Sequence, residues 1–356
     1  MSKQILFYVP YNFSSLNSGS QIRPYNMYKA FLNLGYEVDL IAGNIKTRKE
    51  AFKEIRKKQK KYIFCYSEPS TYPLHPFVDY NIYRYIKKQH IPIAIYYRDA
   101  YWKFSEYFNK RGIKKLELLL RYRADLFLYN HIASVIFFPT STLANMFNIR
   151  VKKLCLPPGG ENKFKNRNNL ISSPLKGIYV GGISFRYGFD ILLHAFRLVN
   201  NRQRVELELV CRDEEFKNIS KEMKNFVDCS WINIHHISGK ALERLYYKAH
   251  FGIIPCHKDK YNDLAIPVKL FEYLSFGIPV IVTDCNEMGK FVKKNECGLV
   301  CKDTPESLAD SILKLTNDFG LYEYLSKNAK KTILNGNLWE DRAKTVESII
   351  LGNKYK

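Results

Sequence analysis

The strongest constraint on the fold is an alternation of short β-rich runs with helical stretches, which occurs once in each half of the 356-residue chain. This pattern is typical of parallel sheets covered by helices on both faces. We therefore predict an α/β protein with two doubly wound, Rossmann-like domains and a cleft between them. The strands are expected at residues 5–9, 37–42, 62–66, 93–97, 134–139 and 153–156, and then at 176–181, 205–211, 232–236, 251–255, 279–283 and 299–301.

A polar break separates the two halves. Two prolines and two glycines at 157–160 precede a stretch at 161–174 that is rich in Asn, Lys and Arg, as is typical of a linker. We expect an N-terminal domain over 1–160, a C-terminal domain over 175–337 and a helix over 338–356 that returns to the first domain. The N-terminus predicts a buried strand rather than a signal peptide, and no apolar run reaches the roughly 18 residues that span a bilayer.

Residues 266–283 are the most informative segment. Pro267 suits the start of a helix and Gly277 its end, and a β-branched strand follows. Lys269 and Glu272 are three residues apart and therefore share a helix face near that start. A helix N-terminus attracts anions, the lysine adds charge suited to a diphosphate, and the carboxylate can accept hydrogen bonds from ribose. The alternative is a surface ion pair on an amphipathic helix.

In each half, one glycine-containing loop follows the first strand. Gly181 and Gly182 allow a ligand to approach the backbone closely, and Arg186 can grip phosphate with two hydrogen bonds. The alternative is a plain turn between strand and helix. In the first half, Gly19 lies in a small, flexible loop that could cradle phosphate or admit an acceptor. Neither loop has the dinucleotide GxGxxG pattern or a Walker A motif.

Charged residues also end two strands of the first half. Arg98 and Asp99 follow the fourth strand, where Asp99 could orient a sugar hydroxyl or stabilise positive character at a reacting carbon. A structural ion pair is the alternative. Glu68 follows the third strand at the same rim and is a weaker candidate for acceptor binding.

The chain is strongly basic, with 56 Lys and Arg against 34 Asp and Glu and a net charge of +22. Basic clusters at 46–61 and 110–115 suit an anionic membrane or nucleic acid, with membrane the preferred reading. A compositional bias of the coding sequence is the alternative. Eight cysteines without a CxxC pair predict reduced thiols and no metal site.

Together these motifs resemble retaining GT-B glycosyltransferases of the family-4 type. The resemblance is strongest in the string Pro-x-Lys-x-x-Glu-Tyr-Leu-x-x-Gly-x-Pro-Val, which begins at Pro267. The string Arg-Asp-x-x-Trp at 98–102 resembles a variant among bacterial polysaccharide enzymes. Leu-Trp-Glu at 338–340 resembles the start of the family's C-terminal crossover helix.

The resemblance implies roles for the candidate residues. Glu272 would bind the ribose of a UDP-sugar or GDP-sugar donor, and Asp99 with Arg98 would stand at the sugar. Transfer would retain the anomeric configuration and need no metal or other cofactor, because positive side chains and helix ends stabilise the leaving diphosphate. The residues implied around the diphosphate are Gly19, Gly181, Gly182, Arg186 and Lys269.

The resemblance also implies partners. The acceptor would be a lipid-linked oligosaccharide or another glycan, and the product a capsule, lipopolysaccharide or other surface polysaccharide. We expect a cytoplasmic enzyme, peripheral on the inner face of the cell membrane, with the basic run at 46–61 against anionic lipid. No nucleic-acid partner is expected.

The sequence departs from the family pattern in its Glu-x7-Glu pair. Leu264 takes the place of the first glutamate, and the adjacent Asp263 is a weak candidate for holding the donor sugar. The alternatives in function are a nucleotide-sugar epimerase on the same fold and, less favoured, a basic nucleic-acid-binding protein. The missing dinucleotide fingerprint disfavours a Rossmann oxidoreductase.

Overall fold

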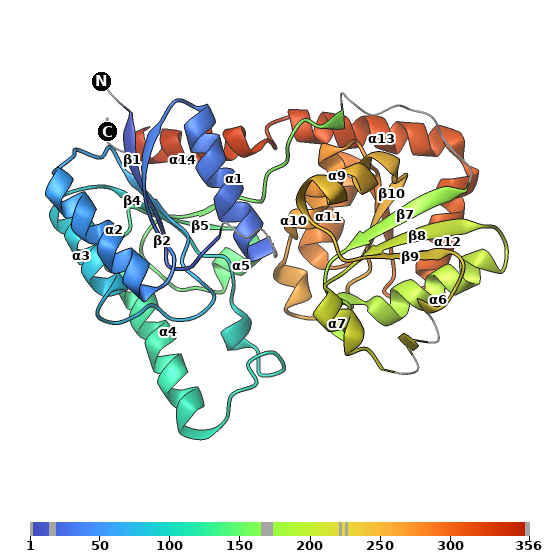
Figure 1. Cartoon of the computed structure of the whole chain (residues 1–356), viewed down its shortest axis with the longest axis horizontal. Coiled ribbons are helices and arrows are strands. Elements are labelled where there is room, and N and C mark those ends of the chain that lie inside the picture. The colour runs from blue at the N-terminus through green and yellow to red at the C-terminus, as the bar shows by residue number, and fades with distance from the viewer. Residues whose placement is uncertain (1–2, 14–18, 165–173, 221–222, 225–226, 353–356) are drawn as a thin grey trace. The chain divides into compact units, whose positions relative to one another are not determined.

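The computed structural model describes residues 3–13, 19–164, 174–220, 223–224 and 227–352. The chain divides into two compact units. The first joins Met1–Pro158 to Trp339–Lys356, and the second is Gly159–Leu338. Each contains a six-stranded parallel sheet with helices on both faces (Figure 1). The predicted α/β class with two Rossmann-like sheets is confirmed.

In the first unit, β1 lies between β2 and β3 in the strand order β2-β1-β3-β4-β5-β6. The residues of β1 from Ile5 to Val9 are at most 1% exposed, as expected for a strand that is buried on both faces. The strands are β1 (Gln4–Val9), β2 (Glu37–Ala42), β3 (Cys65–Ser67), β4 (Ile93–Tyr96), β5 (Val135–Phe138) and β6 (Lys153–Cys155).

The helices of the first unit include one from the end of the chain, α14 (Trp339–Gly352), which packs against α1. The buried guanidinium of Arg342 on α14 donates two hydrogen bonds of 3.1 Å to the carbonyl oxygen of Pro158. The other helices are α1 (Gly19–Asn33), α2 (Ile45–Lys58), α3 (Asp79–Lys88), η1 (Tyr101–Lys103), α4 (Gly112–Ile132) and α5 (Ser141–Asn145).

The basic run at 46–61 mostly forms α2. Arg48 is buried, and its guanidinium contacts both carboxylate oxygens of Asp79, at 2.9 and 3.2 Å. Part of the charge that the sequence suggested for a surface patch therefore stabilises the interior of this unit. Three further ion pairs in the run are Lys57–Glu54, Lys58–Asp39 and Lys60–Asp39.

In the second unit, β7 lies between β8 and β10 in the order β12-β11-β10-β7-β8-β9. The chain winds outward in both directions from β7, so the gap between β7 and β10 is the topological switch point of this sheet. The strands are β7 (Leu175–Val180), β8 (Val205–Val210), β9 (Ile232–His235), β10 (Phe251–Ile254), β11 (Val280–Thr283) and β12 (Gly298–Cys301).

The helices of the second unit cover both faces of its sheet (Figure 1). They are η3 (Phe185–Tyr187), α6 (Phe189–Asn200), α7 (Asp213–Lys217), α9 (Gly239–Lys248), η4 (Asn262–Leu264), α10 (Val268–Ser275), α11 (Asn286–Asn295), α12 (Pro305–Asn317) and α13 (Phe319–Leu334).

All of the predicted strands are present, although β3 starts at Cys65 rather than at residue 62. Most of the predicted linker at 161–174 lies outside the described residues. None of the helices that the structure describes combines the length and the apolarity needed to cross a bilayer.

Candidate functional site

The candidate site of the second unit lies at its topological switch point. The loop at 181–188 follows β7, and the loop at 255–267 follows β10 and leads into α10. In open α/β sheets, ligands bind beyond the carboxyl ends of the strands at such a point. The N-terminus of α10 adds a partial positive charge to the same place.

Gly181 and Lys269 come together at this point. Gly181 has a φ of +152°, and a Cβ atom added to it would lie 2.8 Å from the Nζ atom of Lys269. The same Nζ atom lies 4.5 Å from the ring centroid of Tyr179, and burial lowers the pKa of the Lys269 ammonium. The glycine therefore lets the backbone approach the ammonium group, and the Tyr179 ring also stabilises that group.

Glu272 lies one turn further along α10 and is half-buried. Burial raises the pKa of its carboxyl group to about 7, while the charges of Lys269 and Lys163 act in the opposite direction. Lys269 and Glu272 thus interact electrostatically, as their spacing predicts. A carboxyl group with this pKa changes its protonation state near neutral pH, and only its ionised form can accept hydrogen bonds at both oxygens.

Arg186 and Lys269 both lie against Tyr187. The Arg186 guanidinium carbon is 5.4 Å from the Tyr187 ring centroid and 4.6 Å from that of Tyr261, and the Nζ atom of Lys269 is 5.9 Å from the Tyr187 ring. A Cβ atom on Gly182 would lie 2.6 Å from the Tyr187 ring. The structure therefore brings the predicted phosphate-binding residues of this unit together around one tyrosine.

Sequence reasoning missed the aromatic rings that hold these cations. Tyr187 and Tyr261 come from the two different loops of the site, and Tyr179 comes from β7. The only signal in the sequence is that Tyr187 is separated from the glycine pair by four residues. Its contact with Lys269 depends on the arrangement of the sheet.

Asp263 is already engaged in a structural contact. Its Oδ1 atom accepts a hydrogen bond of 2.7 Å from the backbone N–H of Asn286, the first residue of α11. This contact satisfies one of the free N–H groups at the helix start. The neighbouring Leu264 is buried. A role of Asp263 in holding a donor sugar stays a prediction.

In the first unit, Arg98 and Asp99 lie just beyond β4. The Arg98 guanidinium donates a hydrogen bond to the hydroxyl of Tyr11, which follows β1. Asp99 accepts a hydrogen bond of 2.8 Å from the backbone N–H of Tyr101. Burial lowers the pKa of Arg98 to about 10, against the charge of Asp99. Gly19 begins α1, and residues 14–18 before it lie outside the described residues.

Glu68 does not lie at an exposed rim, which corrects that expectation. Its side chain is fully buried, 3.4 Å from the Nε atom of Arg23, and it accepts a hydrogen bond of 2.6 Å from the Tyr66 hydroxyl. Arg23 in turn stacks on Tyr96, with its guanidinium carbon 3.4 Å from the ring centroid. The carboxylate is kept inside because its counter-charge is also there, so contact with an acceptor would require this pair to separate.

One protein family and one curated relative match part of the chain. Residues 161–332, which make up most of the second unit, match the family described as Glycosyl transferases group 1. An uncharacterized glycosyltransferase of Methanocaldococcus jannaschii is 22% identical over 182 residues, which are 48% of this chain and 43% of that relative. The matched region therefore spans less than half of the relative. Neither comparison favours the epimerase alternative.

Solved structures with the GT-B fold resemble the whole chain. Sucrose-phosphate synthase from Thermosynechococcus elongatus has a TM-score of 0.72 at 15% identity, covering 99% of both chains. HepE from Anabaena, in complex with UDP and glucose, has a TM-score of 0.68 at 11% identity, covering 98% of this chain and 100% of its own. WaaG, a glycosyltransferase involved in lipopolysaccharide biosynthesis, has a TM-score of 0.63 at 14% identity, covering 98% of this chain and 99% of its own. At these identities the likeness establishes the fold.

Proposed function

We propose that this chain transfers a sugar from a UDP-sugar to a glycan acceptor. The observation that carries the proposal is the approach of Lys269 to Gly181 at the switch point of a group 1 glycosyltransferase domain. It places an ammonium group, an open backbone and a helix N-terminus where a nucleotide diphosphate can bind. The choice of UDP is supported by HepE, whose solved structure contains UDP and glucose.

In this proposal, the leaving diphosphate is stabilised by the protein itself. Negative charge grows on that group as the bond to the sugar breaks, and Lys269 and Arg186, which both lie near Tyr187, supply positive charge to stabilise it. Fixed positive charge of this kind takes the role that a divalent cation has elsewhere, so we infer that transfer needs no metal. Glu272 binds the ribose hydroxyls, because it lies one turn beyond Lys269 on α10.

We propose further that the charged pair after β4 in the first unit acts at the sugar, as the family resemblance implies. Asp99 stabilises positive character at the reacting carbon, and Arg98 holds the loop after β4 to the loop after β1 through Tyr11. Attack of the acceptor hydroxyl from the face that the diphosphate leaves would retain the anomeric configuration. We also propose a lipid-linked glycan as acceptor in surface polysaccharide synthesis, at the cytoplasmic face of the membrane. The Arg-Asp-x-x-Trp string at 98–102 and the likeness to WaaG support this choice.

The first test measures binding of UDP, GDP, ADP, CMP and NAD to the full chain. Thermal shift and calorimetry, each with and without magnesium, are the readouts. We expect stabilisation by UDP that does not depend on the metal, and slow hydrolysis of UDP-sugar without an acceptor. A preference for GDP would correct the donor and leave the transferase intact. Stabilisation by NAD alone, or by none of the nucleotides, would overturn the proposal.

A further inference from the structure

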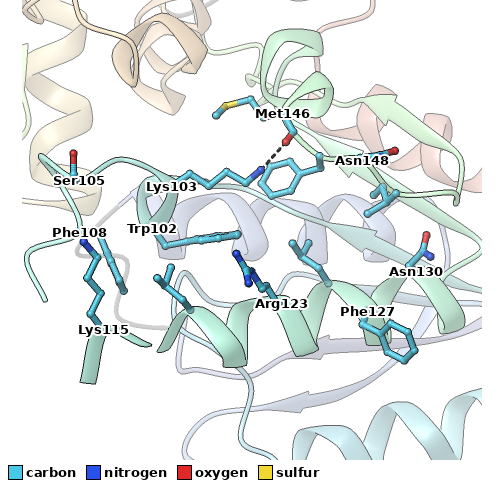
Figure 2. A pocket seen from close by; sticks show the side chains of 14 residues that line it. Trp102, Lys103, Ser105, Phe108, Lys115, Arg123, Phe127, Asn130, Met146 and Asn148 are labelled. Atoms are coloured by element: carbon cyan, nitrogen blue, oxygen red, sulfur yellow. Dashed lines mark hydrogen bonds between the residues drawn. The ribbon is translucent and has the colours of Figure 1, made fainter. Parts of the chain in front are cut away.

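A cavity of about 800 Å³ lies in the first unit, beside the η1 turn that directly follows Arg98 and Asp99. It is formed by η1 and the segment after it, by α4, and by residues 146–149 after α5 (Figure 2). Its lining is cationic and apolar. Lys103, Lys115 and Arg123 contribute positive charge, most of the other side chains are aromatic or aliphatic, and none of the lining residues is acidic.

The charges in this cavity are only partly satisfied by the protein. Lys103 donates a hydrogen bond of 2.6 Å to the carbonyl oxygen of Met146 and lies 4.2 Å from the Phe147 ring centroid. No ion pair or side-chain hydrogen bond joins Lys115 or Arg123 to any residue that the structure describes. Figure 2 shows the Arg123 side chain rising from α4 toward the segment of Trp102 and Lys103. The cavity is therefore suited to an anion that also has an apolar part.

The outer face of α4 carries an exposed apolar stripe next to this cavity. Ile113, Leu116, Leu120 and Phe127 are 86%, 60%, 55% and 68% exposed. Their spacing of three, four and seven residues places them on one helix face. Phe127 also lines the cavity, so the stripe and the cavity are continuous. Basic side chains flank the stripe at Lys110, Arg111, Lys114, Lys115 and Arg123.

We propose that this cavity binds the phosphoryl group of a lipid and that the α4 stripe lies in the interface of an anionic bilayer. An exposed apolar helix face bordered by Lys and Arg is the pattern of a helix that lies in a membrane surface. A soluble phosphorylated ligand would use the cations of the cavity but would leave the stripe in water. A lipid satisfies both, because its chain continues from the phosphoryl group into the apolar layer.

The α4 surface replaces α2 as the membrane contact that the sequence suggested. The run at 46–61 is basic, but it contains no large exposed apolar side chain, and only Ile45 lies directly before it. Several of its charges also form ion pairs. Charge alone attracts a protein to the membrane, whereas buried apolar area anchors it there. This difference gives the experiment a matched control.

The inference extends the proposed function to its acceptor, and its test needs no sugar donor, so the two can fail separately. The full chain is floated with vesicles of phosphatidylcholine, of phosphatidylcholine with phosphatidylglycerol, and of phosphatidylcholine with a polyprenyl phosphate. We expect binding to both phosphate-rich anionic mixtures and little to phosphatidylcholine alone. Stronger binding to the polyprenyl phosphate at equal charge assigns the cavity to the acceptor lipid, and equal binding assigns it to the phospholipid head group.

Three variants locate the contact. Leu116→Ser with Leu120→Ser removes part of the stripe, and Lys115→Gln with Arg123→Gln removes cavity charge. Each should weaken vesicle binding about tenfold or more. The first variant loses apolar area that would be buried in the bilayer interface, and the second loses two basic residues that contribute about 1 kcal/mol each. The control variant removes four charges on and after α2, through Lys57→Gln, Lys58→Gln, Lys60→Gln and Lys61→Gln. Its vesicle binding should fall less than that of the α4 variants, despite its larger change in charge. The substituted side chains are exposed except Lys115, which is half-buried, and thermal unfolding checks that each variant is folded.

Four results would overturn the proposal. The α2 control could lose binding while both α4 variants keep it, or the wild-type chain could ignore anionic vesicles. Inorganic phosphate alone could stabilise the chain through Lys115 and Arg123 as strongly as the lipid does. The stripe variant could instead convert a dimer into a monomer, which would identify a second copy of this chain as the occupant of the stripe.

Discussion

The ammonium group of Lys269 and the backbone of Gly181 are so close that a single added carbon atom on the glycine would come within 2.8 Å of the Nζ atom. Gly181→Ala should therefore displace the lysine and also strain the backbone, because its φ of +152° is unfavourable for other residues. We expect UDP affinity to fall about tenfold, with a loss of stability of about 1–2 kcal/mol.

The control for this change is Gly239→Ala. Gly239 also has a positive φ, +58°, but an added Cβ atom would have no neighbour within 4 Å. The Gly239→Ala variant should lose stability, as measured by chemical denaturation, and keep its UDP affinity, as measured by calorimetry. Equal UDP affinities of the two variants would show that the contact with Lys269 does not matter for binding.

Lys269→Met should discriminate between parts of the nucleotide. The methionine keeps the apolar length of the side chain against Tyr179 but removes the charge. We expect UDP to bind about tenfold or more weakly, since a hydrogen bond to a charged group contributes about 1.5–3 kcal/mol, and uridine to bind as before. Calorimetry with both ligands is the measurement, and an equal loss for uridine would remove Lys269 from the diphosphate site.

Nucleotide affinity should depend on pH through Glu272. Its carboxyl pKa is raised to about 7 by burial, and ribose hydroxyls bind best to the ionised form. Affinity for uridine and UDP should therefore rise as the pH is raised through about 7. Glu272→Gln should remove this rise, and Glu272→Ala should weaken both ligands at every pH.

The same carboxyl group makes the opposite contribution to stability. Since its pKa is higher in the folded chain than in the unfolded one, the free energy of unfolding should fall as the pH rises from the ordinary carboxyl range to about 7. Glu272→Gln should flatten that fall. A wild-type chain whose uridine affinity stays constant over this range would contradict the assignment to ribose.

Asp99→Asn tests the proposed role at the sugar. The asparagine keeps an oxygen that can accept the hydrogen bond from Tyr101 N–H, so the loop should stay in place, while the negative charge is lost. We expect turnover of the sugar donor to fall about a hundredfold, with unchanged UDP affinity. Steady-state kinetics and calorimetry separate the two quantities, and unchanged turnover would exclude Asp99 as a catalytic residue.

Glu68→Ala should unfold the first unit more readily. The change leaves Arg23 buried without its carboxylate partner, which costs about 3–5 kcal/mol in comparable buried pairs. Glu54→Ala, which removes the exposed partner of Lys57, is the control and should leave stability unchanged. A Glu68→Ala chain that keeps its stability but loses acceptor binding would restore the role that the sequence suggested.

The two sheets could be predicted from the sequence because buried parallel strands are short apolar, β-branched runs, and this signal lies within each run itself. It also predicted that Lys269 and Glu272 share one face of α10, since helix periodicity is local. It failed for Glu68 because burial of a carboxylate depends on a distant partner, Arg23, that no spacing reveals. The α4 cavity was missed for the same reason, since η1 and residues 146–149 meet α4 only in the folded unit.

The hydrogen bonds from Arg342 to Pro158 show that the last helix of the chain completes the first unit. The buried side chains of Trp339, Val346 and Ile350 on α14 belong to that core. A protein shortened at its C-terminus would thus be damaged in the half that is synthesised first. During synthesis this helix leaves the ribosome after the whole second unit, so the N-terminal half must wait with an open face until the other half has emerged.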